Sequence, residues 1–231
     1  MKVPRRIRSS SLMPLPLAFL AWLAASCAWA GGAHATSTPP PTVGTQISVG
    51  DGGLIGPSEC ERPCLWGLLP GTSTEDDLND ALAEWGYLDS CTPIAETPSW
   101  GRALACGPDL GFSFDSGGST IATISFVPDA PIELSAIVAA LGGPSEVIVL
   151  LVGTPDHPLV AARLLFGESA TIIWLAQEDG IEYPINPDTV AQNVIYASQS
   201  AFEEIRGSLR AHSSSWAGFG VYSDPNPLML Q

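Results

Sequence analysis

The chain has 231 residues, of which 45% are hydrophobic, and its 24 acidic residues outnumber the 9 basic ones to give a net charge of −15. A chain this hydrophobic is not expected to be disordered, because disorder couples high charge to low hydrophobicity. The acidic balance also excludes nucleic acid and anionic lipid headgroups as expected partners, since such a surface repels their phosphates.

Residues 1–26 have the pattern of a signal peptide. Four basic residues and no acid precede residue 9, an apolar run follows from Leu12 to Leu23, and small residues come next. Pro14 and Pro16 interrupt the run, which is shorter than the roughly 20 residues of a membrane-spanning helix. We therefore predict export to the cell envelope or the extracellular space. Loss of the leader would leave five basic residues against 24 acidic ones.

Two cleavage sites compete after the apolar run. Residues 23–27, Leu-Ala-Ala-Ser-Cys, approximate the motif at which lipoproteins are cleaved, which would make Cys27 the lipidated N-terminus. Ala28-Trp29-Ala30 before Gly31 fits ordinary signal-peptidase cleavage instead. Membrane attachment is therefore expected only through a lipid anchor on Cys27.

Residues 27–58 are predicted to be a flexible linker. They are rich in Pro, Thr and Gly, with Pro39-Pro40-Pro41 and Gly50-Asp51-Gly52-Gly53 among them, and they show almost no apolar periodicity. A linker of this length suits a domain that is held away from a membrane or wall surface.

Four cysteines follow the linker: Cys60, Cys64, Cys91 and Cys106. In an exported chain, four thiols indicate two disulfides. The favoured pairing is Cys60 with Cys64 and Cys91 with Cys106, because the second pair flanks two strands that are expected to be adjacent. Zinc is the alternative, but the spacings lack the C-x2-C knuckles of a zinc ribbon, so no metal is expected.

Residues 59–128 are predicted to form a first α+β unit. Hydroxyl and acidic residues at 72–77 start a helix, because such side chains accept hydrogen bonds from its free N–H groups, and Gly86 ends it. Four residues at helical spacing are expected to form its apolar stripe: Leu78, Ala81, Leu82 and Trp85. Extended pieces follow at 102–106, 112–115 and 121–127, and the last two are predicted to form a hairpin.

Residues 129–223 are predicted to repeat this order as a second α+β unit, with residues 224–231 as a tail. Asp129-Ala130-Pro131 is expected to start the helix and Gly142-Gly143-Pro144 to end it. Strands are predicted at 147–152, 159–166, 171–176 and 190–197. The prediction is an α+β fold, a tandem repeat of a helix plus antiparallel strands, with the helices packed on one face of the sheet.

The C-terminal part places apolar residues at helical spacing, Phe202, Ile205 and Leu209, before an aromatic segment at 216–222. Trp216 and Tyr222 are candidate anchors for a partner, because Trp and Tyr contribute much of the binding energy at protein interfaces. Core packing or a closing edge strand is the favoured alternative for this aromatic cluster.

The opening of the first unit carries a family resemblance. Residues 63–74, Pro-Cys-Leu-Trp-Gly-Leu-Leu-Pro-Gly-Thr-Ser-Thr, resemble uncharacterised exported bacterial proteins that share a Pro-Cys-x-x-Gly-x-x-Pro-Gly-x-Ser/Thr opening. With Leu-Gly-Gly-Pro-Ser at 141–145, the helix-flanking turns are also similar to the SmpA/OmlA (BamE) lipoprotein domain and the tandem β-lactamase-inhibitor-protein module. This likeness implies a role in binding other proteins and supplies no catalytic residue. The chain departs from both modules in its Cys60 and Cys64 pair and in its weaker first-unit strands.

Catalytic chemistry has little support in the sequence. His157, with Asp156 and Ser169, would make an acid–base set with a nucleophile, but the two prolines around Asp156-His157 indicate a hairpin turn and no G-x-S-x-G elbow marks a serine. No calcium loop and no glycine-rich phosphate loop occurs. We therefore expect no cofactor.

These patterns predict a membrane-tethered binding or scaffold module of the cell envelope more than an enzyme. Its partner is expected to be an envelope or extracellular protein or ligand of unknown identity. An extracellular hydrolase of unrecognised type is the alternative.

Overall fold

The structure, a computed structural model, describes residues 47–56, 63–97, 101–154 and 156–226. These residues belong to one compact unit, residues 41–231. No helix within these ranges has the length and apolar character that a membrane span requires. The predicted leader, Cys27 and Cys60 lie outside the described residues.

The described residues form three helices, two short 3-10 turns and twelve strands. The helices are α1 (Glu75–Glu84), α2 (Leu134–Leu141) and α3 (Gln199–Leu209), and the 3-10 turns are η2 (Leu88–Ser90) and η3 (Arg210–His212). The strands are β1 (Cys91–Thr97), β2 (Gly101–Cys106), β3 (Leu110–Phe114), β4 (Ile121–Phe126), β5 (Glu146–Thr154), β6 (His157–Phe166), β7 (Thr171–Leu175), β8 (Glu178–Asp179), β9 (Glu182–Ile185), β10 (Ala191–Ala197), β11 (Ser213–Ser215) and β12 (Gly220–Ser223).

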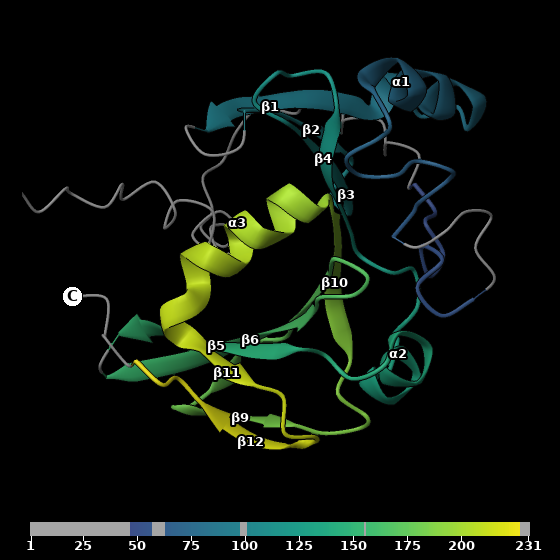
Figure 1. The fold of residues 1–231 in the computed structure, drawn as a ribbon. Coiled ribbons are helices and arrows are strands. Elements are labelled where there is room, and N and C mark those ends of the chain that lie inside the picture. Colours follow the sequence, from purple (N-terminus) through teal and green to yellow (C-terminus); the bar gives the residue numbers. More distant parts are fainter. Residues whose placement is uncertain (1–46, 57–62, 98–100, 155, 227–231) are drawn as a thin grey trace, which may run out of the picture. The chain divides into compact units, whose positions relative to one another are not determined.

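Ten strands form one antiparallel sheet in the order β1-β2-β3-β4-β10-β7-β6-β5-β11, with β8 paired to β6 beside this path (Figure 1). β9 and β12 form a separate two-stranded sheet. In the large sheet β4 pairs with β10, with Val194 opposite Phe126, so β1–β3 lie to one side of this pair and β5–β7 to the other. The predicted α+β class is confirmed, and so are the strands predicted at 147–152, 159–166 and 171–176.

The two faces of the large sheet are covered differently. Successive side chains of a strand alternate between faces, and along β6 Leu164 joins one apolar cluster and Leu165 the other. The first cluster includes Leu78 of α1 and Ile137 of α2, whereas the second includes Phe202 of α3. We call these sides the α1/α2 face and the α3 face. The predicted packing of the helices on one face is wrong for α3, which crosses the opposite face (Figure 1).

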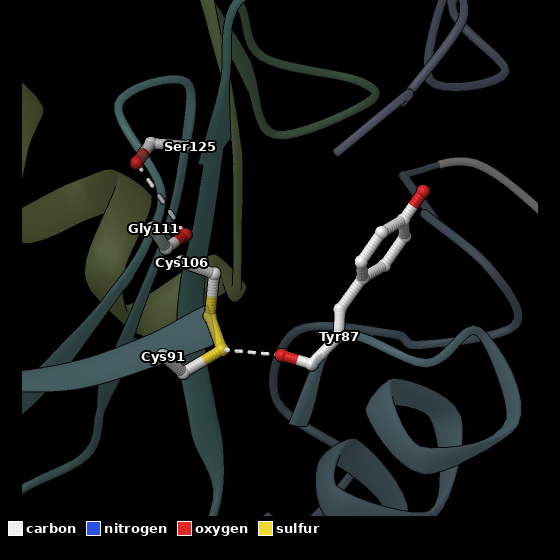
Figure 2. The surroundings of a disulfide bond; sticks show 5 residues. All are labelled: Tyr87, Cys91, Cys106, Gly111 and Ser125. Carbon is white, nitrogen blue, oxygen red and sulfur yellow. Dashed lines mark hydrogen bonds between the residues drawn. A yellow bond between two sulfur atoms is a disulfide. The ribbon is translucent and has the colours of Figure 1, made fainter. Parts of the chain in front are cut away.

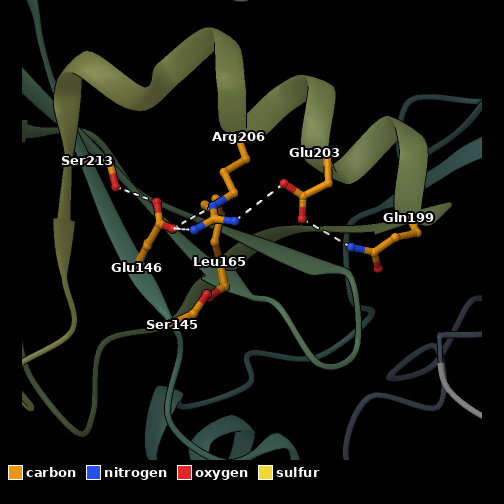
Figure 3. A network of polar contacts seen from close by, with 7 residues as sticks. All are labelled: Ser145, Glu146, Leu165, Gln199, Glu203, Arg206 and Ser213. Carbon is orange, nitrogen blue, oxygen red and sulfur yellow. Dashed lines mark hydrogen bonds and ion pairs between the residues drawn. The ribbon is translucent and has the colours of Figure 1, made fainter.

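Polar contacts join α3 to the edge of the sheet. Arg206 of α3 pairs with Glu146 at the start of β5 and with Glu203 one turn earlier, and Ser213 of β11 donates to the same Glu146 (Figure 3). Partial burial on its own raises the pKa of Glu146, but the hydrogen bonds from Ser213 and Arg206 and the charge of Arg206 hold it below its usual range.

The start of α2 differs from the predicted one. Asp129 does not cap a helix; it accepts hydrogen bonds from the Ser48 hydroxyl and from the Val49 and Gly50 N–H groups. The helix begins at Leu134, whose N–H donates to the carbonyl of Thr189. A loop carbonyl therefore takes the place of a capping side chain.

Residues 47–56 depart from the predicted linker at 27–58. Ile47, Val49 and Leu54 are buried in the main core, and the Tyr196 hydroxyl donates to the carbonyl of Gly52. A Cβ atom on Gly52 would lie 2.1 Å from the Phe126 ring, so only glycine allows this close approach. This segment is thus part of the fold, because three apolar side chains leave water for the core.

The predicted disulfide between Cys91 and Cys106 is confirmed (Figure 2). The two residues lie directly opposite each other on β1 and β2 and close a loop with a sequence separation of 15. Cys64 is buried and also disulfide-bonded, while Cys60, its predicted partner, lies outside the described residues.

Candidate functional site

A tight turn presents Trp66 beside α1. Leu65 and Leu68, both buried, exchange backbone hydrogen bonds of 3.1 and 2.8 Å and leave Trp66 and Gly67 as the two residues of the turn. Both have positive φ angles, +54° for Trp66 and +78° for Gly67, as in a type I′ turn. Glycine adopts this conformation freely, whereas for tryptophan it costs roughly 1–2 kcal/mol. The turn therefore holds Trp66 in a strained backbone conformation.

The C-terminus of α1 brings two more aromatic rings to the same place. Gly86, at φ +75°, ends the helix, and the N–H groups of Gly86 and Tyr87 donate to the carbonyls of Ala83 and Leu82. These two bonds make a Schellman motif, which reverses the chain. Trp85 at the C-cap and Tyr87 beyond the glycine therefore lie close together in space.

The three rings stack with Trp66 as the common partner. Its ring centroid lies 5.4 Å from that of Trp85, with an interplanar angle of 16°, and 6.1 Å from that of Tyr87, with an angle of 26°. Trp66 and Tyr87 pack against the main core, whereas Trp85 is 51% exposed. The predicted place of Trp85 in the apolar stripe of the helix is therefore wrong. We call these three residues the aromatic stack.

An acidic hollow adjoins the aromatic stack. It has a volume of about 370 Å³, and its lining includes Trp66 together with Asp77, Asp80 and Glu84. The three acids recur at i, i+3 and i+7, so they share one face of α1. Hydrogen bonds from the N–H and the hydroxyl of Thr74 hold the pKa of Asp77 below its usual range, so its carboxylate stays charged.

The charge of this surface is largely uncompensated. α1 carries five acidic residues and no basic one. Glu75 pairs with Arg102 of β2, and among the described residues no basic group lies within ion-pair distance of Asp77, Asp80 or Glu84. A cation that enters the hollow would therefore meet both an indole face and carboxylates that form no ion pair with the described residues.

The predicted anchors Trp216 and Tyr222 lie in a different cluster. Their rings stack at 5.8 Å and 5°, both are half-buried, and both pack against the main core. The Tyr222 hydroxyl donates to the carbonyl of Gly218 and accepts from the N–H of Ala217. These contacts agree with the packing role that the sequence favoured, and an anchoring role stays a prediction.

The candidate catalytic residues do not meet. His157, exposed beside Asp156, opens β6, whereas Ser169 lies in the turn after the other end of that strand. The ten residues of β6 place these two ends about 30 Å apart, at roughly 3.3 Å per residue. The Ser169 hydroxyl also bonds to the carbonyl of Phe166 and to Thr171. His157 and Ser169 are therefore too far apart to act together as a catalytic base and a nucleophile.

Another histidine, His212, pairs with an aspartate, Asp224, near the C-terminal end of the fold. Nδ1 of His212 lies 2.9 Å from both carboxylate oxygens of Asp224, which is buried and also accepts from the N–H of Asn226. In the described part of the chain, no hydroxyl or thiol bonds to the His212 ring. The pair therefore lacks a nucleophile and ties the C-terminal segment to η3.

The aromatic stack and the His212–Asp224 pair were both missed in the sequence. Trp66 lies in a segment whose Pro and Gly residues indicate a turn, but no local pattern shows that Trp85 and Tyr87 return to it. Comparisons with protein-family models, with curated proteins and with solved structures found no match.

Proposed function

We propose that the chain is an exported binding module that holds a basic segment of a partner protein on the aromatic stack. The observation that carries the proposal is the positive φ of Trp66. Strained backbone persists where the surroundings enforce it, and it concentrates at functional sites. Here the strained residue is an indole that lies beside the carboxylates of the acidic hollow.

The chemistry of the surface favours a cationic ligand. A Lys or Arg side chain over an indole gains about 0.5–1 kcal/mol at an exposed site, and an exposed ion pair adds about 0–1 kcal/mol. Asp80 and Glu84 supply the carboxylates beside Trp66. The few contacts of this size that one basic segment can make add up to about millimolar affinity, and the acidic surface speeds its approach.

Fluorescence anisotropy of a dye-labelled tetra-arginine peptide tests this proposal on the mature domain. We expect saturable binding that weakens about fivefold in Trp85→Ala, the equivalent of about 1 kcal/mol. Phe219→Ala is the matched control, because Phe219 is also exposed, at 41%, but lies in the cluster around Trp216. Trp85 is half-exposed but stacks on Trp66, so its loss should cost about 0.5–1.5 kcal/mol of stability, and thermal unfolding should show that the variant is still folded.

A second pair of variants separates a local carboxylate effect from the general charge of the protein. Asp80→Asn and Asp179→Asn each remove one negative charge, but Asp80 lines the hollow and Asp179 lies on β8. Charges beyond about 8 Å are largely screened at physiological salt. We expect only Asp80→Asn to weaken binding. Equal weakening by both variants, or displacement of the peptide by a neutral oligosaccharide, would contradict a cation site.

We also propose that the protein is exported and anchored through Cys27, as the leader pattern predicts. The support is the order of basic, apolar and small residues in positions 1–27 together with a disulfide between Cys91 and Cys106, a bond typical of oxidising compartments. Mass spectrometry of the native protein should find its N-terminus between Cys27 and Thr36. A diacylglyceryl mass on Cys27 supports the anchor, and an intact Met1 would refute export.

The fold is proposed to be a tandem repeat. The strand order supports this. In chain order, β1, β2, β3 and β4 run from one side of the sheet to its centre, and β5, β6, β7 and β10 run from the other side to the centre. A helix precedes each set of four strands, α1 the first and α2 the second. An experimental structure should superpose the two sets in this order. α3 and β9, which have no counterpart in the first half of this scheme, would then be additions to the second half.

A further inference from the structure

Arg163 differs from the other arginines that the structure describes. Arg102 pairs with Glu75, Arg206 pairs with Glu146 and Glu203, and the charge of Arg210 acts on Glu146. No carboxylate of the described residues lies within ion-pair distance of Arg163, and no hydrogen bond to its guanidinium is present among them. In a chain with 24 acidic residues, a cation without an acid is unexpected.

The guanidinium of Arg163 lies over an indole on the α3 face. It stands 4.2 Å from the ring centroid of Trp174, which is half-buried and packs against the cluster beneath α3. Burial lowers the pKa of Arg163 to about 10, and no opposite charge counters this effect. Arg102 also lies over an aromatic ring, that of Phe114 at 4.6 Å, but Arg102 forms an ion pair with the Glu75 carboxylate.

Arg163 belongs to a row of hydrogen-bond donors that crosses three strands. Trp174 of β7 lies directly opposite Arg163 of β6, and Asn193 of β10 lies directly opposite Trp174. Residues that pair across strands share one face of the sheet, with Cβ atoms about 4.5–5.5 Å apart. The Trp174 Nε1 atom is buried and finds no hydrogen-bond partner among the described residues. A buried donor without a partner is destabilising, because it has lost its hydrogen bond to water.

We propose that the row of Asn193, Trp174 and Arg163 binds a carboxylate group of a ligand. A carboxylate accepts two parallel hydrogen bonds from one guanidinium, and this geometry needs no second cation. Two partly buried apolar residues of the same cluster, Leu150 and Ile195, would border the ligand. The site lies on the α3 face, so it is independent of the aromatic stack and of the function proposed for it.

A carboxylate can come from a free organic acid or from the C-terminus of a peptide. Sodium acetate and N-acetyl-alanyl-alanine are the two probes, and each is titrated against the disulfide-intact domain at constant ionic strength with sodium chloride as the reference. The readout is the indole N–H resonance of Trp174, assigned with Trp174→Phe. We expect a saturable shift with at least one probe beyond that with chloride. If the peptide binds more tightly than acetate, the natural carboxylate is the C-terminus of a peptide. If the two probes bind equally, it is a free organic acid.

Arg163→Gln removes the charge and should weaken binding of the probe about tenfold or more. Arg102→Gln is the matched control, since it removes an arginine that also lies over an aromatic ring, and it should change the affinity less than twofold. An equal affinity in wild type and Arg163→Gln would overturn the proposal. If Arg163→Gln does not fold, the wild-type titration decides alone, because a shift no larger than that with chloride refutes the site.

Discussion

Replacing Trp66 by glycine and by alanine tests whether strain is stored at the aromatic stack. Both variants lose the indole, so they differ only in backbone preference at φ +54°. In the folded state, alanine pays roughly 1–2 kcal/mol for the left-handed conformation, and glycine does not. Glycine instead lowers the free energy of unfolding by about 0.4–1 kcal/mol, because its unfolded chain has more conformational entropy. The glycine variant should therefore be more stable than the alanine variant by about 0.5–1 kcal/mol.

The neighbouring residue Trp85 provides the control for this comparison. It lies at the C-cap of α1 with φ −84°, an ordinary helical value. There alanine should be more stable than glycine by roughly 0.5–1 kcal/mol, the reverse order. Thermal unfolding of the four variants measures both differences, and 1 kcal/mol corresponds to about 2–4 °C in Tm for a domain of this size. An alanine variant at Trp66 as stable as the glycine variant would refute the stored strain.

Three further substitutions test the fold. Cys91→Ser should lower the free energy of unfolding by about 3 kcal/mol, because the disulfide closes a loop with a separation of 15; urea unfolding with an unchanged midpoint would contradict this. Gly52→Ala should cost at least about 2 kcal/mol, since it adds left-handed strain to overpacking against Phe126, and a neutral effect would mean that residues 47–56 do not pack as described. Glu146→Gln tests a pH dependence. The lowered pKa of Glu146 stabilises the fold above the ordinary carboxyl pKa of 4.5 and loses this effect as pH falls through the folded value. The stability difference from wild type should therefore shrink between pH 7 and pH 3, and a constant difference would exclude the contact with Arg206.

Local patterns were enough to predict the secondary structure of much of the chain. The stripe of Leu78 and Leu82 and the capping residues before them identified α1, because both signals lie within one helix. The strands at 147–176 were found because β-branched and apolar residues dominate them. The disulfide of Cys91 and Cys106 followed from the expectation that the strands beside them are neighbours.

Features that depend on distant segments could not be predicted in this way. Asp129 was expected to cap a helix, but its carboxylate binds Ser48, which is 81 residues away in the sequence. Gly50–Gly53 has the composition of a linker, and its place is fixed by distant residues, through the close approach of Gly52 to Phe126 and hydrogen bonds with Asp129 and Tyr196. α3 has an apolar stripe that suits either face of the sheet, so its placement opposite α1 required the whole topology.

In the candidate site, too, local patterns were read from the sequence, but contacts between distant segments were not. Trp85 was interpreted as a core residue from its spacing, although at the C-cap it lies where the helix leaves the core and is half-exposed. The contact of Trp66 with Trp85 and Tyr87 joins a turn to the end of a helix, and no periodic pattern reports such a contact. The acids at the start of α1 were interpreted as capping residues, which holds for Asp77, whereas Asp80 and Glu84 lie further along the helix and line the hollow.

The most direct test of the basic-segment site is a titration of the isotopically labelled domain with a tetra-arginine peptide whose C-terminus is amidated, so that it carries no carboxylate, followed through the indole N–H resonances. We expect the resonances of Trp66 and Trp85 to shift together with one dissociation constant, while those of Trp174 and Trp216 stay in place. Added salt should weaken the binding, since the carboxylates beside Trp66 contribute to it. Unmoved resonances of Trp66 and Trp85, or a dominant shift at Trp216, would contradict a basic-segment site on the aromatic stack.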